Sequence, residues 1–212
     1  MIKSLRILHT LESLEMQIKS KACGAYATNC YIVMINGKEI IIDPGMGAVS
    51  WVLEQVYNPV AILNTHGHFD HVWSNAELAE KLHIPIYAPK GDCFMLENDP
   101  FLQGTPSSHA DVCVSGDETF VIEGIEVSFL HFPGHTPGCS AILINDTLFS
   151  GDFIFKNSIG RYDFPYSDET QMRESLEKFL KIEKNWEIYP GHGASTTLKS
   201  EQKNIPHWLR VL

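Results

Sequence analysis

The feature that most constrains this chain of 212 residues is a cluster of three histidines and an aspartate directly after an apolar run. The run covers residues 60–65 (V-A-I-L-N-T) and predicts a short buried β-strand. The cluster H-G-H-F-D-H follows it at residues 66–71. In layered α/β proteins, ligands bind beyond the carboxyl ends of such strands. The sequence therefore predicts a functional loop at the end of a strand.

The spacing inside this loop suits metal binding. In extended backbone, residues two apart point the same way, so His66 and His68 can bind one ion, whereas on a helix they would diverge by roughly 200°. Gly67 leaves room for a sharp turn. Asp70 and His71 then lie beyond the bend and offer a carboxylate and an imidazole to a second ion. One short loop is therefore predicted to serve two metal ions.

Composition narrows the class of protein. With 44% hydrophobic residues, we expect a sizeable core in one domain over residues 1–212. A formal net charge of −10 argues against nucleic acid as a partner. No stretch approaches the ~20 apolar residues of a membrane span, and the N-terminus lacks the apolar core of a signal peptide. Five cysteines without a C-x-x-C pair indicate reduced thiols, so we expect a cytoplasmic protein without a membrane partner.

Alternating β-rich runs predict three hairpins. The first joins residues 30–35 to 39–42 through Asn36-Gly37, a dipeptide that tolerates the positive φ angles of a tight turn. Two similar units cover residues 120–132 and 141–150.

Apolar spacing predicts four helices, over residues 47–57, 74–81, 167–184 and 197–204. Ser74 with Glu77 resembles a capping box, and Ser167 is the expected cap of the third helix. The last helix should stop before Pro206. The second helix, between the strand at 60–65 and another at 84–88, predicts a βαβ unit whose parallel strands are buried between helices.

Two regions give weaker patterns. Residues 1–20 have no clear caps, so their structure stays open. Residues 89–116 are rich in Pro, Gly and Ser and are predicted to be mostly loop, with a short helix near Phe94 and a wall of the substrate cleft.

Three more polar side chains follow predicted strands: His135, Asp152 and His192. Each has a neighbouring glycine or proline that would hold its loop close to a shared centre. The alternation of β-rich halves with helices favours an α/β fold of the αββα type, a four-layer sandwich.

Taken in order, these motifs resemble those of the metallo-β-lactamase fold superfamily. The resemblance covers the chain from about Cys30 onward and rests on H-G-H-F-D-H (66–71), G-H-T-P-G (134–138), S-G-D (150–152) and P-G-H-G (190–193). The flanking motifs are most similar to the short form of the glyoxalase II-like hydrolases: N-C-Y (29–31), I-D-P-G (42–45), S-I-G-R-Y-D-F (158–164) and T-T-L-K-S-E (196–201).

The resemblance implies a dinuclear centre with seven protein ligands. One metal would take His66, His68 and His135, the other Asp70, His71 and His192, and Asp152 would bridge both. This set of nitrogen and oxygen ligands suits two divalent ions, zinc above all, with iron or manganese as alternatives. Asp43 is predicted to support one of the ligands through a hydrogen bond.

Two adjacent cations predict hydrolysis. They would lower the pKa of a bridging water to supply hydroxide and polarise the substrate carbonyl. A thioester is a natural target because its thiolate leaves without a strong proton donor. Asp70 and Asp152 are the candidate catalytic residues, and Arg161 and Asp163 either contact the substrate or form a surface ion pair. We therefore expect a thioester hydrolase (EC 3.1.2-like) acting on an acylglutathione-type substrate.

Other functions remain possible alternatives. Persulfide dioxygenases of the same superfamily share the G-R-x-D stretch but use one iron, which here would bind His68 or a neighbour, His135 and Asp152. A metal-occupied binding protein without catalysis is a third reading. β-Lactam hydrolysis is disfavoured because Asp152 resembles the hydrolase branch. Few residues follow His192, so we expect no counterpart of the C-terminal domain that binds glutathione in full-length glyoxalase II, and the thiol carrier stays open.

Overall fold

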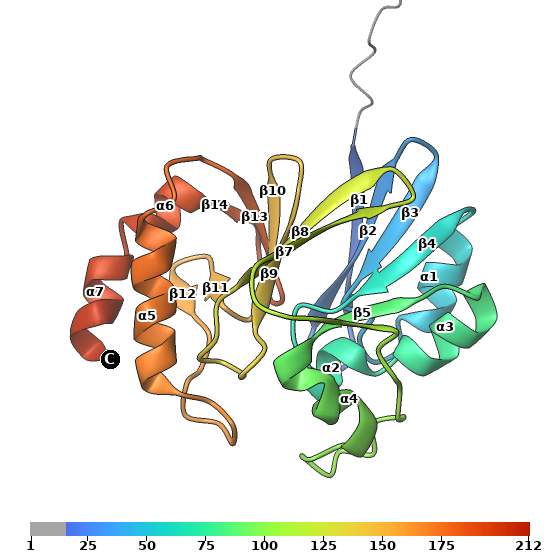
Figure 1. Ribbon diagram of the computed structural model, residues 1–212, viewed down its shortest axis with the longest axis horizontal. Coiled ribbons are helices and arrows are strands. Elements are labelled where there is room, and N and C mark those ends of the chain that lie inside the picture. The colour runs from blue at the N-terminus through green and yellow to red at the C-terminus, as the bar shows by residue number, and fades with distance from the viewer. Residues whose placement is uncertain (1–15) are drawn as a thin grey trace, which may run out of the picture.

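The computed structural model describes residues 16–212 and shows two six-stranded β-sheets packed face to face, with helices on their outer faces (Figure 1). The first half of the chain builds β1 (Gln17–Cys23), β2 (Thr28–Ile35), β3 (Lys38–Ile42), α1 (Val49–Gln55), β4 (Pro59–Leu63), α2 (Phe69–Val72), α3 (Asn75–Leu82), β5 (Ile86–Pro89), the 3-10 turn η1 (Lys90–Asp92), α4 (Cys93–Asn98) and β6 (Val112–Val114). These six strands form one sheet in chain order.

The second half builds β7 (Glu118–Ile122), β8 (Ile125–His131), β9 (Ser140–Ile144), β10 (Thr147–Gly151), β11 (Ile154–Phe155), β12 (Ser158–Ile159), α5 (Glu169–Leu180), β13 (Glu187–Pro190), β14 (Thr196–Thr197), α6 (Leu198–Gln202) and α7 (Ile205–Val211). Its main sheet has the order β14-β13-β10-β9-β8-β7, and β11 pairs with β12 separately. The predicted αββα four-layer architecture is confirmed.

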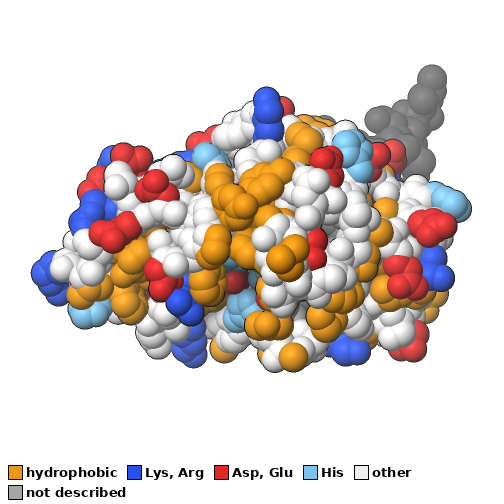
Figure 2. All heavy atoms as spheres, turned by 90° about the horizontal axis from the view of Figure 1, so that it is seen from below, with side chains coloured by type: hydrophobic (Ala, Val, Ile, Leu, Met, Phe, Trp, Pro, Cys, Tyr) orange, Lys and Arg blue, Asp and Glu red, His pale blue; other side chains and the backbone are white. Residues whose placement is uncertain are grey.

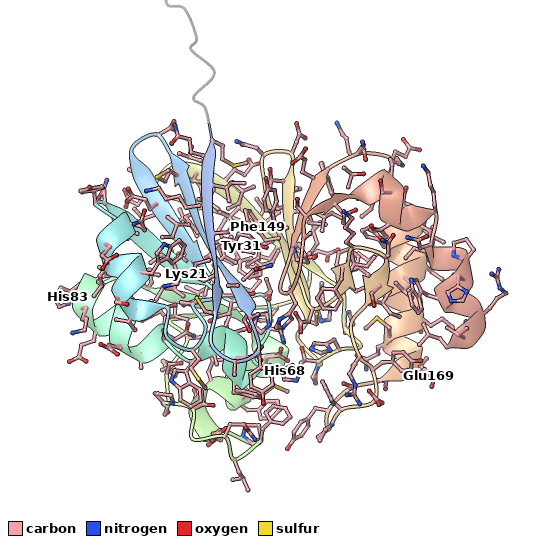
Figure 3. All side chains as sticks on the ribbon, turned by 180° about the vertical axis from the view of Figure 1, so that it is seen from behind. Lys21, Tyr31, His68, His83, Phe149 and Glu169 are labelled. Atoms are coloured by element: carbon pink, nitrogen blue, oxygen red, sulfur yellow. The ribbon has the colours of Figure 1, made fainter. Side chains whose placement is uncertain are left out.

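Three apolar cores hold the layers together. The central core lies between the sheets, where Tyr31 of β2 and Phe149 of β10 meet with ring centroids 5.2 Å apart (Figure 3). A second core joins the first sheet to α1 and α3, and a third joins the second sheet to α5, α6 and α7. Tyr31 and Val33 face the central core while Cys30 and Ile32 face the helices. Because both faces of β2 are buried, its sequence is apolar almost throughout.

The three predicted hairpins are present as β2–β3, β7–β8 and β9–β10. The βαβ unit is also confirmed, since β4 and β5 pair in parallel. Its strands differ from the prediction in one respect: helices cover only one face, and the second sheet covers the other. In residues 89–116 the structure has η1, α4 and β6, so the predicted short helix near Phe94 is present.

Ser74 is the N-cap residue of α3 as predicted, but its predicted capping hydrogen bond is wrong, and Ser167 is not the cap of α5. The Ser74 hydroxyl makes no capping hydrogen bond; it donates to the Gly45 carbonyl at 2.7 Å and so ties α3 to the loop after β3. Helix α5 is capped by Asp168, whose carboxylate accepts from the Gln171 amide at 2.8 Å. Ser167 instead donates to the carbonyl of His135. In both cases a tertiary contact takes the hydroxyl that local sequence would assign to a cap.

The ends of the chain add elements that the sequence left open. Residues 1–15 of the ambiguous N-terminal stretch lie outside the described residues, whereas β1 begins at Gln17. Helix α6 ends before Pro206 as predicted, but α7 was missed, because Pro206 lies in the first turn of a new helix, where its lacking N–H costs nothing. Among residues 16–212, no helix is both long and apolar enough to span a lipid bilayer.

Candidate metal centre

The loops at one edge of the two sheets bring the predicted ligands together. Strands β3 and β4 are parallel, as are β10 and β13, so their carboxyl ends meet at the same edge. Figure 3 shows His68 at this edge, between the two halves of the molecule. Six of the seven predicted ligands are buried, and the seventh, His192, is partly exposed. The group comprises His66, His68, Asp70, His71, His135, Asp152 and His192.

The local backbone explains how one loop presents two groups of ligands. His68 has extended backbone angles (φ −65°, ψ 143°), and α2 starts directly after it and carries Asp70 and His71. The predicted bend is therefore the start of a helix. The chain bends at Thr65 and His66, directly before Gly67, whose own φ is not positive. A Cβ there would lie 2.9 Å from atoms of Asp92, so this glycine allows close packing instead.

The side chains form two triads whose donor atoms face one another. The ligand atoms of His66, His68 and His135 lie within 4.8 Å of each other, and those of Asp70, His71 and His192 do so as well. These are the two sets that the family resemblance implied. A third overlapping group adds Asp43 to His66 and His71.

Asp152 lies between the two triads. Its Oδ1 is 3.4 Å from His71 Nε2, and its Oδ2 is 3.5 Å from His135 Nε2 and 3.4 Å from His192 Nε2. The carboxylate thus reaches a member of each triad. This is the position that a bridging ligand requires.

These atoms fit divalent metal ions better than they fit hydrogen bonds. His71 Nε2, His135 Nε2 and Asp152 Oδ1 are buried and have no hydrogen-bond partner among residues 16–212, which is costly unless something else binds them. Their separations of 3.4 to 3.5 Å exceed a normal hydrogen bond. Two ligands on one tetrahedral zinc would be about 3.3 to 3.4 Å apart, given Zn–N and Zn–O bonds of about 2.0 to 2.1 Å. The donor set and spacing therefore suit divalent cations.

Hydrogen bonds from outside the cluster orient three of the imidazoles. Asp43 Oδ2 lies 3.0 Å from His71 Nδ1, as predicted for this aspartate. His135 Nδ1 donates to the backbone carbonyl of Arg161 at 2.7 Å, and His192 Nδ1 donates to that of Tyr26 at 3.0 Å. Because a carbonyl or carboxylate can only accept, each Nδ1 carries a proton, and Nε2 is the nitrogen that each ring directs at the centre.

Two supporting residues were missed by the sequence analysis. Thr28 donates to Asp70 Oδ2 at 2.6 Å. The buried carboxylate of Asp92 accepts from the amides of Gly67 and Gly138, at 2.9 and 2.6 Å, and from the Thr136 hydroxyl at 2.6 Å. Asp92 therefore ties the loop of His66 and His68 to the loop of His135. Nothing in local sequence marks either residue, since their partners are 25 to 46 positions away.

The pKa shifts differ from one ligand to the next: those of His66 and His68 are lowered, whereas neighbouring carboxylates raise those of His71 and His192 against the effect of burial. Burial lowers the pKa of His66 well below its usual value and that of His68 to about 3, and nearby imidazoles add to the effect. Burial alone would raise the pKa of Asp70, but neighbouring histidines and the Thr28 hydroxyl hold it at about 2. Burial likewise opposes a charge on His192, but hydrogen bonds to the carboxylates raise its pKa to about 9. A metal ion and a proton thus compete for His192 Nε2.

Arg161 and Asp163 lie outside the two triads. Their side chains bind each other in two parallel hydrogen bonds of 2.8 Å, from Nε and Nη2 to the two carboxylate oxygens. Both are largely exposed, at 63% and 60%. Only the backbone carbonyl of Arg161 reaches the cluster, through His135. Substrate binding by the two side chains stays a prediction.

An Asp43→Ala variant is expected to bind metal at the Asp70, His71 and His192 triad about 10 to 100-fold more weakly. Asp43 accepts from Thr65 through both oxygens as well as from His71, so its loss frees the imidazole to turn. Chelator competition with the purified protein measures this affinity. Asp43 also has a positive φ of 48°, which Asn tolerates; Asp43→Asn is the matched variant that removes the charge without straining the backbone. Equal affinity in all three proteins would contradict the role.

Comparison with known proteins places the chain in a family. Residues 23–192 match the model of the metallo-beta-lactamase superfamily, and the chain belongs to that superfamily. Hydroxyacylglutathione hydrolase GloC of Haemophilus influenzae is 32% identical over 206 residues, covering 90% of this chain and 97% of its own length.

Two solved structures are similar over nearly their whole length. The BLEG-1 B3 metallo-beta-lactamase superposes with a TM-score of 0.82 at 31% identity, covering 91% of this chain and 99% of its own. TTHA1623, crystallised in a di-iron-bound form, has a TM-score of 0.75 at 31% identity and covers 89% of this chain and 99% of its own. With the histidine and aspartate cluster, these relatives define a metal-dependent hydrolase of this superfamily.

Proposed function

We propose that the protein is a dinuclear metal-dependent thioester hydrolase. The observation that carries the proposal is the position of Asp152 between two complete triads, with five of the seven proposed ligands lining one cavity. The similarity to a hydroxyacylglutathione hydrolase over 206 residues supports a thioester as the substrate. Zinc is the expected metal, with iron and manganese as alternatives for the same ligands.

The seven ligands proposed in the sequence analysis would hold the two ions. When bound, two such cations supply Lewis acidity toward a carbonyl oxygen and an activated water near neutral pH. The chain's own contribution is to fix the ligands: Asp43 and the carbonyls of Tyr26 and Arg161 each hold one imidazole in a single orientation.

Asp70 and Asp152 are the proposed catalytic residues. Asp70 Oδ2 is held by the Thr28 hydroxyl at 2.6 Å, and both carboxylates line the cavity. A negative charge at this position can orient a reacting water by accepting its proton in a hydrogen bond. Because a thiolate is a good leaving group, the reaction needs no strong acid on the opposite side of the carbonyl.

The expected result of metal analysis is two ions per chain, and the metal-loaded protein is expected to hydrolyse S-lactoylglutathione and S-acetyl-N-acetylcysteamine. Stripping with a chelator should abolish the activity, and added zinc should restore it. The corresponding oxygen ester and a chromogenic β-lactam are the comparison substrates, which measure ester hydrolysis and β-lactam hydrolysis by the same protein. Two bound ions with no cleavage of any thioester would contradict the proposal.

The rival function is a single-iron persulfide dioxygenase, whose iron would bind His68 or a neighbour, His135 and Asp152. These three are adjacent, with ring centroids of the histidines 4.5 Å apart. However, a single-iron site does not need the second triad, whose members are equally well oriented by Thr28, Asp43 and Tyr26. One iron per chain and oxygen consumption with glutathione persulfide would support the dioxygenase and overturn the hydrolase.

A further inference from the structure

The cavity above the metal centre has a polar floor and an apolar wall. It has a volume of about 400 Å³, and five of its lining residues are proposed metal ligands. Apart from Gln103, the others are apolar or aromatic: Tyr26, Phe69, Phe101, Phe164 and Pro165. Figure 2, which views this lower face, shows orange side chains gathered around its middle, with histidine visible among them. A group attached to the reacting carbonyl would therefore meet aromatic rings.

Two of these rings lie directly against the ligands. The ring centroid of Phe101 is 5.1 Å from that of His68. Phe164 is 6.0 Å from His68 and 6.1 Å from His135. Tyr166 packs against Phe101 from outside, at 6.0 Å. Because the apolar wall begins at the first ligands, it reaches the atoms next to the scissile bond and not only the remote part of a substrate.

Large apolar side chains are also exposed around this opening. Tyr26, Phe164 and Tyr166 are 56%, 36% and 50% exposed, and Leu102, next to Phe101, is 90% exposed. They make up four of the nine large hydrophobic side chains that are exposed in residues 16–212. Exposed apolar side chains gathered at one place mark a binding surface, whereas single ones are ordinary. Such a group of exposed apolar side chains is typical of a surface that binds an apolar ligand.

Outside the proposed metal centre, the described residues that line the cavity offer no basic side chain to an anionic substrate. Within residues 16–212, no lysine or arginine lines it. Arg161 packs over the Phe164 ring at 4.2 Å, but Asp163 neutralises its guanidinium through two hydrogen bonds. A thiol such as glutathione carries two carboxylates, which such a rim would leave without partners. Recognition by charge is therefore weak here, and recognition by apolar contact is strong.

We propose that the preferred substrate is a thioester with an aromatic or similarly bulky apolar group next to the scissile carbonyl, packed between Phe101 and Phe164, and that the charges of a glutathione-like thiol are not recognised. This inference rests on the proposed thioester hydrolysis and names its substrate class. The bulky group can belong to the acyl or to the thiol side, since both flank the same carbonyl.

The test compares kcat/KM of the metal-loaded protein on a two-by-two set: acetyl or phenylacetyl as the acyl group, and N-acetylcysteamine or glutathione as the thiol. S-Benzyl thioacetate is added to place the ring on the thiol side. We expect phenylacetyl or S-benzyl thioesters to exceed the acetyl-N-acetylcysteamine thioester by about tenfold or more, as apolar pockets discriminate. Exchanging N-acetylcysteamine for glutathione should change kcat/KM by less than threefold.

Variants connect this preference to the rings. Phe101→Ala and Phe164→Ala should reduce the ratio of phenylacetyl to acetyl thioester by about fivefold or more, mostly through KM, because apolar packing acts on the bound substrate. Phe164→Leu keeps most of the apolar volume while it removes the ring, and it serves if the alanine variant folds poorly. Tyr57→Ala, at an aromatic residue 91% exposed elsewhere on the surface, is the matched control with an unchanged ratio.

The outcomes separate the two proposals. The apolar substrate class would be overturned if kcat/KM were the same for the acetyl thioester as for the phenylacetyl and S-benzyl thioesters. It would also be overturned if glutathione thioesters were preferred tenfold over N-acetylcysteamine thioesters. Thioester hydrolysis would stand in both cases. Failure to cleave any of the five compounds would overturn the hydrolase proposal and this inference with it.

Discussion

An Asp152→Asn variant is expected to lose thioester hydrolysis by about 10³-fold in kcat/KM and to retain at most one metal ion per chain. Asp152 Oδ1 faces His71 and its Oδ2 faces His135 and His192, so its two oxygens serve both triads. The amide removes the negative charge and turns one acceptor into a donor. The amino group of this amide would face the imidazole nitrogens that bind the cations and would compete with the cations for these nitrogens.

Metal content of the purified variant and kcat/KM with saturating zinc test this expectation together. Asp146→Asn is the matched control, because it is the same substitution at an exposed aspartate far from the cluster. Asp146 lies in the turn between β9 and β10. Thermal unfolding of both variants shows whether any loss comes from folding. Two ions per chain and undiminished hydrolysis in Asp152→Asn would remove the bridging role.

Local periodicity accounts for what the sequence predicted about the site. His66 and His68 could be paired because extended backbone repeats every two residues, and Asp70 and His71 because they lie just beyond a break in that pattern. The grouping with His135, Asp152 and His192 needed the ordered family motifs. No periodicity relates positions that are 64 to 126 residues apart, although all of them follow strands.

The hydrogen bonds that support the ligands could not be predicted for the same reason: they join residues that are far apart in the sequence. Asp92 lies in a region whose sequence predicts mostly loop, yet it is fully buried and joins two ligand loops. Ser74 and Ser167 were assigned to capping hydrogen bonds because capping patterns consider only partners that are near in the sequence. Both hydroxyls instead donate to carbonyls that are distant in the sequence. Strands and hairpins were predicted well, since their apolar runs are set by burial on both faces.

An Asp92→Ala variant is expected to lose about 3 to 5 kcal/mol of unfolding free energy. It leaves the amides of Gly67 and Gly138 buried without an acceptor, whereas the Thr136 hydroxyl can rotate toward another partner. Burial raises the pKa of Asp92, opposed by its hydrogen bonds, so the carboxylate depends on these donors to stay ionised. Its removal therefore costs more than one ordinary hydrogen bond.

The same variant should weaken zinc binding at the His66, His68 and His135 triad by about 10 to 100-fold, because Gly67 lies between two of these ligands. Asp92→Asn should have a smaller effect on unfolding, about 1 to 2 kcal/mol, since its carbonyl can still accept from Gly67 and Thr136 while its amino group faces Gly138. Denaturant unfolding of the metal-free proteins separates stability from affinity, and Asp146→Ala is the surface control. If Asp92→Ala loses more unfolding free energy and zinc affinity than Asp92→Asn, and Asp92→Asn loses more than the control, Asp92 links the two ligand loops. Equal unfolding free energy and equal zinc affinity in all variants would show that the loops hold their positions without it.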